Sequence, residues 1–157
     1  FMNDYLRYIK NDPYFRSGCH NNLTFSMIYA YSEKFILVFS HDEVVHGKAT
    51  MLGKMPGERM EQFANLRLTY AYLMTHPGKK LIFMGQDIGE YGEWNEERAV
   101  EWELLENDEH KKLNRLVSDL NKMYTTMPAM YLKDDSWEGF EWINCITPQS
   151  CMLSYLR

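Results

Sequence analysis

The sequence predicts an α/β chain that continues into a small β region. Two short apolar runs, residues 35–39 and 81–84, each end abruptly in polar residues, as strands buried on both faces of a parallel sheet do. A helical pattern lies between them, so the order is strand, helix, strand, which is one βα unit followed by the next strand. Two later runs, residues 139–145 and 151–156, predict an antiparallel pair of strands.

The first element is predicted from helical spacing. Met2, Leu6 and Ile9 recur at the spacing of one helical face, which predicts a helix over residues 1–10. Pro13 follows in a segment that breaks this pattern, so the helix is expected to stop before it.

The middle of the chain is expected to form the βα unit. Residues 23–31 are apolar and aromatic, which favours a short buried helix, with a strand as the alternative. A strand over residues 34–39 comes next, followed by a glycine-containing loop over residues 43–59; ordered loops of this length tend to be functional. An amphipathic helix begins at about Arg59 and is stopped by the His-Pro-Gly of residues 76–78.

The last third of the chain changes character at a proline. A polar loop after the second strand runs to about residue 101, and a third helix extends from about Asp108 to just before Pro128. Beyond it the pattern changes, and the two strand-like runs are joined by a turn at residues 147–150. We therefore predict one unit over residues 1–127 and the start of a separate all-β domain over residues 128–157.

Composition narrows the class of protein. The 157 residues are 45% apolar and 25% charged, which is typical of a globular chain. The net charge is −5 with no basic tract, which argues against nucleic acid or an anionic membrane as a partner. The aromatic share of 15% suits either sugar stacking or a large core.

The cysteines and the chain ends add two expectations. Cys19, Cys145 and Cys151 follow no metal-ligand spacing, and their odd number argues against a complete disulfide framework, so a cytoplasmic location is expected. No apolar run approaches the length of a membrane span. The chain begins at Phe1 and stops directly after a strand-like run, so we expect a piece of a longer protein.

Polar residues at the end of the first strand are the main site candidates. His41 and Asp42 come directly after the strand, and in parallel α/β folds chemistry sits at the C-terminal strand ends. A carboxylate and an imidazole there can grip neighbouring sugar hydroxyls, and a fixed negative charge stabilises an oxocarbenium ion. A solvated turn is an equally good interpretation of this pattern. Zinc binding by His41, Asp42 and His46 is disfavoured, because no further ligand follows at a familiar spacing.

The end of the second strand offers a further candidate. Gln86 and Asp87 are predicted to lie on the same rim as His41, although a capped turn fits them equally well. Tyr91, Trp94 and Trp102 follow in the polar loop and could stack on sugar rings, although loop packing is expected for at least one of them.

Several motifs together resemble one family. The segment Ser40-His-Asp-Glu-Val-Val-His-Gly-Lys48 is similar to bacterial-type 1,4-α-glucan branching enzymes, which belong to the α-amylase superfamily (glycoside hydrolase family 13). Further matching segments are residues 22–27, 52–57, 63–67, 76–80, 81–86, 93–95, 119–121 and 139–142. The resemblance therefore covers nearly the whole chain.

The resemblance implies the C-terminal portion of a (β/α)8 TIM barrel followed by the first strands of an all-β C-terminal domain. It gives Asp42 the role of the third catalytic carboxylate, which stabilises the transition state, with His41 as its sugar-binding neighbour. Gln86, Trp94 and Asn95 are expected to bind substrate. In the family the nucleophile and the acid/base residue lie on earlier strands, and no residue here corresponds to them. Asp87 stands where the family more usually has a glutamate, so no role is assigned to it.

The family reaction is a retaining transfer that cleaves an α-1,4-glucan and passes the segment to a 6-hydroxyl, forming an α-1,6 branch. The expected partner is therefore α-1,4-glucan such as glycogen or amylose, and neither a cofactor nor a metal is implied. The alternatives are a hydrolase or trehalose-forming relative with the same barrel, and a non-catalytic glucan-binding module. The βα order argues against the module, because such modules are all-β.

Overall fold

A pair of parallel strands joined by a helix forms the centre of the structure. In the computed structural model, which describes residues 1–157, β1 (Ile36–Phe39) pairs in parallel with β2 (Lys79–Ile82). The connection is made by α3 (Arg59–Thr75), so the predicted βα unit and its following strand are confirmed. In the register of the pair, Phe39 lies opposite Ile82.

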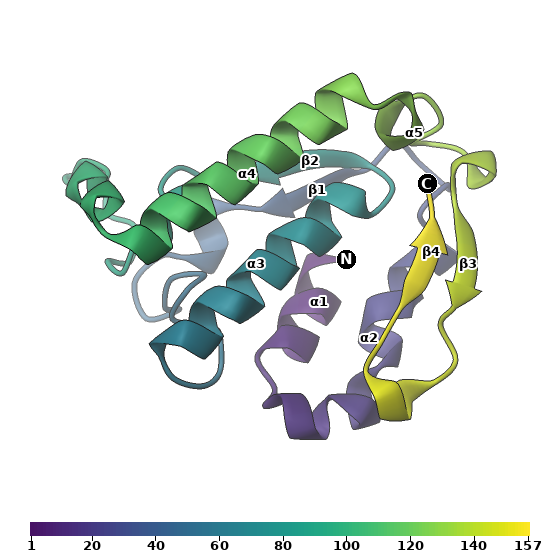
Figure 1. Ribbon diagram of the computed structural model, residues 1–157, viewed down its shortest axis with the longest axis horizontal. Helices are drawn as coiled ribbons and strands as arrows, with labels where there is room; N and C mark the ends of the chain where they lie inside the picture. Colours follow the sequence, from purple (N-terminus) through teal and green to yellow (C-terminus); the bar gives the residue numbers. More distant parts are fainter.

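The other elements surround this pair. Figure 1 labels the helices and strands. The remaining ones are α1 (Met2–Ile9), α2 (Asn21–Thr24), α4 (Asp108–Thr126), α5 (Pro128–Tyr131), β3 (Glu141–Asn144) and β4 (Ser154–Leu156). No helix combines the length and the apolar character that crossing a bilayer requires.

Two of the strand predictions need correction. The second strand begins at Lys79 instead of Leu81, because the Lys79 amide already donates to the Phe35 carbonyl at 3.0 Å. Neither strand is buried on both faces: Ile36 and Leu81 are exposed, whereas Leu37 and Phe39 are buried. The sheet within these residues has only two strands, so each strand keeps one unpaired edge.

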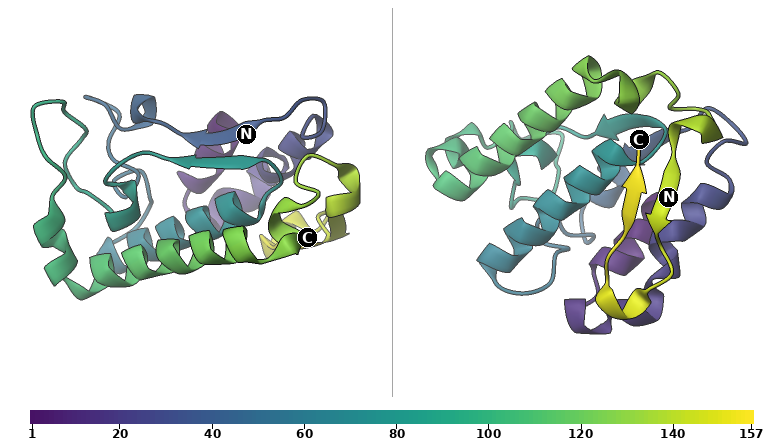
Figure 2. Two further views of the ribbon diagram at one scale, coloured as in Figure 1. Left: turned by 90° about the horizontal axis from the view of Figure 1, so that it is seen from above. Right: turned by 45° about the vertical axis from the view of Figure 1, so that its right-hand side comes forward.

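Helices cover one side of the strand pair and enclose the core. In the left view of Figure 2, α3 and α4 run side by side beneath the two strands. The core between these layers is made of large apolar side chains that are almost completely buried, among them Ile9, Phe39, Phe63, Tyr70 and Leu113. Burial of this apolar surface is the main force that holds the layers together.

The predicted helix over residues 23–31 is divided in the structure. α2 ends at Thr24, and a 3₁₀ turn over Phe25–Ile28 continues from it. The prediction of helical character was therefore correct, but Phe25 and Ile28 are exposed and the segment is only partly buried.

The hairpin at the end of the chain packs against the helices. β3 and β4 are antiparallel, as predicted. The Tyr155 ring lies edge-on to Tyr72 of α3, and its hydroxyl is 2.5 Å from the Thr75 Oγ1. His20 Nε2 lies 3.0 Å from the Cys145 carbonyl oxygen. These contacts join the hairpin to the preceding residues, and the domain boundary at residue 128 stays a prediction.

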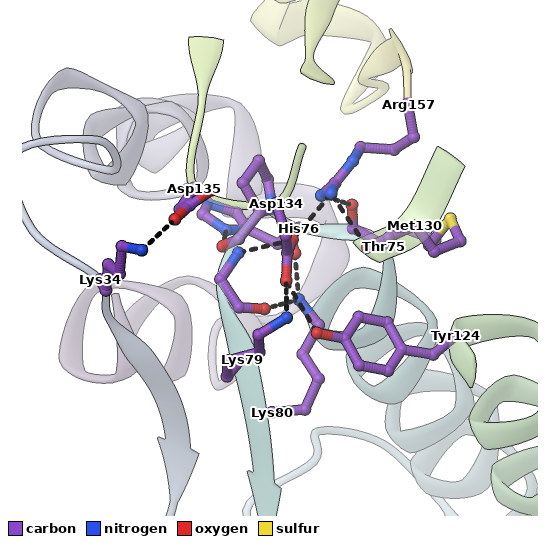
Figure 3. Close-up of polar contacts among 12 residues, drawn as sticks. Lys34, Thr75, His76, Lys79, Lys80, Tyr124, Met130, Asp134, Asp135 and Arg157 are labelled. Carbon is purple, nitrogen blue, oxygen red and sulfur yellow. Dashed lines mark hydrogen bonds and ion pairs between the residues drawn. The ribbon is translucent and has the colours of Figure 1, made fainter. Parts of the chain in front are cut away.

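The buried carboxylate of Asp134 connects the end of the hairpin to the beginning of β2 (Figure 3). Asp134 accepts hydrogen bonds from the Arg157 guanidinium at 2.8 Å, the Tyr124 hydroxyl at 2.7 Å and the Gly78 amide at 2.9 Å. The Lys79 ammonium lies 3.5 Å away. Burial alone would raise the pKa of Asp134, but the hydrogen bonds from Arg157 and Tyr124 outweigh it and lower the pKa below its usual value.

Arg157 extends this cluster to two further elements. Its guanidinium donates to the Thr75 carbonyl at the end of α3 and to the Met130 carbonyl in α5, at 2.9 and 3.2 Å. The side chains of Arg157 and Asp134 are only 6% and 3% exposed, so this pair is shielded from water. Arg157 is therefore fixed near the start of β2. Removing either partner of the ion pair would leave the other charge buried and unpaired, which is costly.

We predict that Asp134→Ala lowers the free energy of unfolding by about 3–5 kcal/mol, because the Arg157 guanidinium is left buried without its anion. Asp135→Ala is the matched control. Its ion pair with Lys34 at 3.0 Å is exposed, so the expected loss is below about 1 kcal/mol. Chemical denaturation of the full-length protein that contains this chain measures both, and equal losses for the two variants would contradict the prediction.

Candidate functional site

The segments that follow the two strands lie at the same end of the sheet. His41 and Asp42 are in a 3₁₀ turn (His41–Glu43) directly after β1, and Gln86 begins a second 3₁₀ turn (Gln86–Ile88) after β2. Because β1 and β2 are parallel, both turns are at their C-terminal ends, as the left view of Figure 2 shows. The predicted common rim is therefore present.

His41 and Asp42 form an exposed pair on this rim. The His41 Nε2 lies 3.1 Å from the Asp42 Oδ1, and both side chains are open to solvent. The His41 ring packs against the rings of Phe83 and Trp94, with centroids 5.8 and 5.7 Å away. This packing orients the imidazole toward Asp42, and one carboxylate oxygen is left free to accept a hydroxyl proton.

Trp94 reaches the rim through a backbone hydrogen bond. Its amide donates to the Val44 carbonyl at 2.8 Å, which brings the polar loop of residues 83–101 against the turn that carries Asp42. Asn95 follows on the surface, where its side-chain oxygen accepts from the Glu97 amide at 2.8 Å. Trp94 therefore contacts His41 directly, whereas Asn95 stabilises its own loop.

Gln86 lies on this rim, as predicted, but its side chain is enclosed and not open to solvent. The chain turns at Gly85, whose left-handed conformation (φ 79°) favours glycine, and the Gln86 side chain is only 4% exposed. Neither its amide oxygen nor its amide nitrogen has a hydrogen-bond partner. It lines a small pocket together with Val44, Met84 and Trp94. A buried amide with two unpaired groups is costly unless another polar group reaches it.

The other residues near the rim have mainly structural contacts. The Asp87 carboxylate accepts from the Asn114 amide at 2.9 Å and is thereby held to α4. The Tyr91 ring packs against His110 with centroids 5.2 Å apart, while Trp102 is exposed. His46 is fully exposed, and residues 1–157 contain no group of three metal-binding side chains.

Sequence reasoning missed two charged residues that shape the loop after Asp42. Lys54 is buried, and its ammonium donates to the Glu43 carbonyl and, at 2.6 Å each, to the Lys48 and Ala49 carbonyls. Burial lowers the pKa of Lys54 to about 8, so the ammonium remains charged at neutral pH. Nothing in the residue type of Lys54 distinguishes it from an exposed lysine, and only the fold reveals this role.

Glu93 is the second such residue. Its carboxylate accepts from the Gly47 amide at 2.9 Å and from the Ala49 amide at 2.7 Å. These two hydrogen bonds lower the pKa of Glu93, because they favour the ionised form. Glu93 lies in one of the segments that carry the family resemblance, but no pattern within that segment indicates its partner.

We predict that Lys54→Met lowers the free energy of unfolding by about 1–3 kcal/mol, because the carbonyls that surround the ammonium lose their donor. Lys48→Met is the control, because Lys48 is exposed and its ammonium bonds only the Asp42 carbonyl; its expected change is within about 0.5 kcal/mol. Denaturant titration of the full-length protein that contains this chain measures both variants, and an unchanged midpoint for Lys54→Met would refute the prediction.

The similar proteins found by comparison with known proteins share one name. No protein-family model matches the chain. The chain is 49% identical over all 157 residues to the 1,4-alpha-glucan branching enzyme GlgB of Thermosynechococcus vestitus, of which it covers 20%. It is 51% identical to the protein of the same name from Dechloromonas aromatica and 50% identical to that from Oleidesulfovibrio alaskensis, covering 25% of each.

These identities extend over the whole chain, which spans about a fifth to a quarter of the length of the curated relatives it matches. From its first residue to its last, the chain is therefore related to one segment of the bacterial-type 1,4-α-glucan branching enzymes, and the resemblance inferred from its motifs is confirmed.

Proposed function

We propose that this chain is part of the catalytic unit of a branching enzyme, which cleaves an α-1,4-glucan and transfers the segment to a 6-hydroxyl. The observation that carries the proposal is the exposed His41–Asp42 pair at the C-terminal end of β1, within a chain 49% identical to proteins of that name. Catalytic residues occupy this end of the strands in parallel α/β barrels.

In this proposal residues 1–127 form the C-terminal part of a (β/α)8 barrel, and β1 and β2 are its seventh and eighth strands. Residues 128–157 begin the all-β domain. Three features support this arrangement: the strands are parallel, α3 crosses between them, and each strand has an unpaired edge. The apolar side chains of Ile36 and Leu81 are exposed on one face of the pair. Unpaired edges of this kind favour pairing with further strands.

Asp42 acts in this mechanism through its charge. A retaining transfer uses a nucleophilic carboxylate and a carboxylic acid about 5–5.5 Å apart. The acid protonates the departing 4-oxygen while the nucleophile bonds to C1. In the second step a 6-hydroxyl attacks C1, the deprotonated acid takes the hydroxyl proton, and the nucleophile leaves as a carboxylate. Both steps pass through an oxocarbenium-like state, which a third, fixed carboxylate stabilises. Asp42 takes this role, and the other two carboxylates are assigned to strands of the enzyme outside residues 1–157.

His41 and Trp94 would bind the same sugar residue that Asp42 contacts. The His41 ring is held between Phe83 and Trp94, so its orientation is set before substrate arrives. Preorganised groups stabilise a transition state at no reorganisation cost. The unpaired amide of Gln86 supports a polar contact behind Trp94, to a hydroxyl or to an ordered water. Asn95 follows Trp94 on the surface, and we propose that its exposed side chain also binds the substrate.

We predict that Asp42→Asn in the full-length enzyme lowers the branching rate by about 10²-fold or more, because the negative charge is lost where positive charge develops. The thermal unfolding midpoint should stay unchanged, since Asp42 is exposed. Asp119→Asn on the outer face of α4 is the control and should retain full activity. Branching is measured as the loss of iodine staining of amylose, and near-wild-type branching by Asp42→Asn would sink the assigned role.

We also predict that residues 1–157, expressed by themselves, do not branch amylose and are poorly folded. Two parallel strands with free edges and a hairpin of four and three residues lack the partners that stabilise a sheet. The iodine assay, a thermal melt and amide exchange test both halves. A cooperative melt would contradict the folding part. Branching by the isolated chain would mean that the nucleophile and acid lie within it.

A further inference from the structure

We propose that Glu93 is a positioning residue for the branching reaction: its carboxylate holds the loop of residues 43–49 so that Asp42 is presented to the substrate. This inference rests on the proposed function. It assigns Glu93 no contact with the sugar, because both of its oxygens are already occupied by backbone amides of the loop.

The loop that Glu93 holds has a conformation that needs support. Gly47 and Ala49 both have positive φ values, 81° and 61°. Glycine adopts this left-handed region freely, but alanine does so at a cost, because its Cβ approaches the following carbonyl oxygen. Successive amides in such a backbone converge and form a concave site for an anion. The Glu93 carboxylate occupies that site, with its oxygens 2.9 and 2.7 Å from the two amide nitrogens.

Lys54 supports the same loop with a positive charge, which binds backbone carbonyls. Its ammonium binds the carbonyls of Glu43, Lys48 and Ala49, while Glu93 binds the amides of Gly47 and Ala49. At Ala49, the strained residue, both backbone groups are therefore held by a charged side chain. Charge-assisted hydrogen bonds are roughly twice as strong as neutral ones, so the two residues together can maintain a costly backbone.

The loop is connected directly to the candidate catalytic residue. Asp42 immediately precedes it, and the Lys48 ammonium returns to the Asp42 carbonyl at 2.6 Å. The residue after Glu93 binds the Val44 carbonyl through its backbone, and its indole packs on His41. Glu93 and Trp94 therefore hold the turn at several points, and removing the Glu93 carboxylate leaves the Gly47 and Ala49 amides without their acceptor.

The test compares variants of the full-length enzyme. Glu93→Ala removes both acceptors, and Glu93→Gln keeps one acceptor oxygen but places an NH₂ group against the other amide. We expect kcat for branching to fall by about 10- to 100-fold for Glu93→Ala and less for Glu93→Gln, because small displacements of a catalytic group have effects of this size. Glu96→Gln is the matched control: Glu96 is exposed in the same loop, and kcat should not change.

Two further measurements separate positioning from a general loss of structure. Hydrogen–deuterium exchange of residues 43–50 should become faster in Glu93→Ala, while exchange in β1 and β2 stays at the wild-type rate. Ala49→Gly should then restore part of the kcat lost in Glu93→Ala, by about fivefold, because glycine adopts the left-handed conformation without the carboxylate.

Each outcome decides the proposal. Unchanged kcat in Glu93→Ala, unchanged exchange in the loop, equally faster exchange in β1 and β2, or no recovery with Ala49→Gly would each overturn it. If the wild-type enzyme does not branch amylose, the proposed function is wrong, and the exchange comparison alone then shows whether Glu93 holds the loop.

Discussion

Parallel pairing of β1 with β2 is the constraint on which the rest of the structure depends. The register that places Phe39 opposite Ile82 brings the C-terminal ends of both strands to one level. The turn that carries His41 and the loop that carries Trp94 can therefore meet, although they are separated by the whole of α3. A shift of the register by one residue would turn Leu37 and Phe39 away from the core. The register that buries these side chains is therefore also the one that assembles the site.

The two ends of the strand pair have different tasks. At the beginning of β2, Asp134 and Arg157 form a shielded polar cluster that joins the hairpin to α3 and α5 (Figure 3). At the other end, His41 and Asp42 remain exposed. The buried pair is held by several hydrogen bonds to neighbouring groups, whereas a group that must bind a substrate has to keep unused acceptors. The same chemical type, an aspartate beside a basic side chain, is thus structural at one end and available for binding at the other.

The loop after Asp42 shows how a strained backbone is maintained. Ala49 has a left-handed conformation that its side chain disfavours, and Glu93 and Lys54 bind the polar groups around it. Strain of this kind persists only where the surrounding structure over-determines it, and it gathers at sites where a side chain must be presented in one orientation. The placement of these two charges beside the candidate catalytic turn agrees with that rule.

The sequence by itself determined the βα unit and the strand ends that carry the candidate site. Apolar runs ending in polar residues, helical spacing and the breaker at residues 76–78 predicted β1, α3 and β2, because these signals depend on neighbours in the chain. Only the tertiary structure decided that Gln86 is enclosed, that the strands have one exposed face, and that Glu93 binds amides 46 and 44 residues away. Contacts across such separations arise from packing of whole elements. Local sequence patterns do not predict these contacts, since an exposed glutamate and a glutamate that binds the amides of a loop have the same side chain.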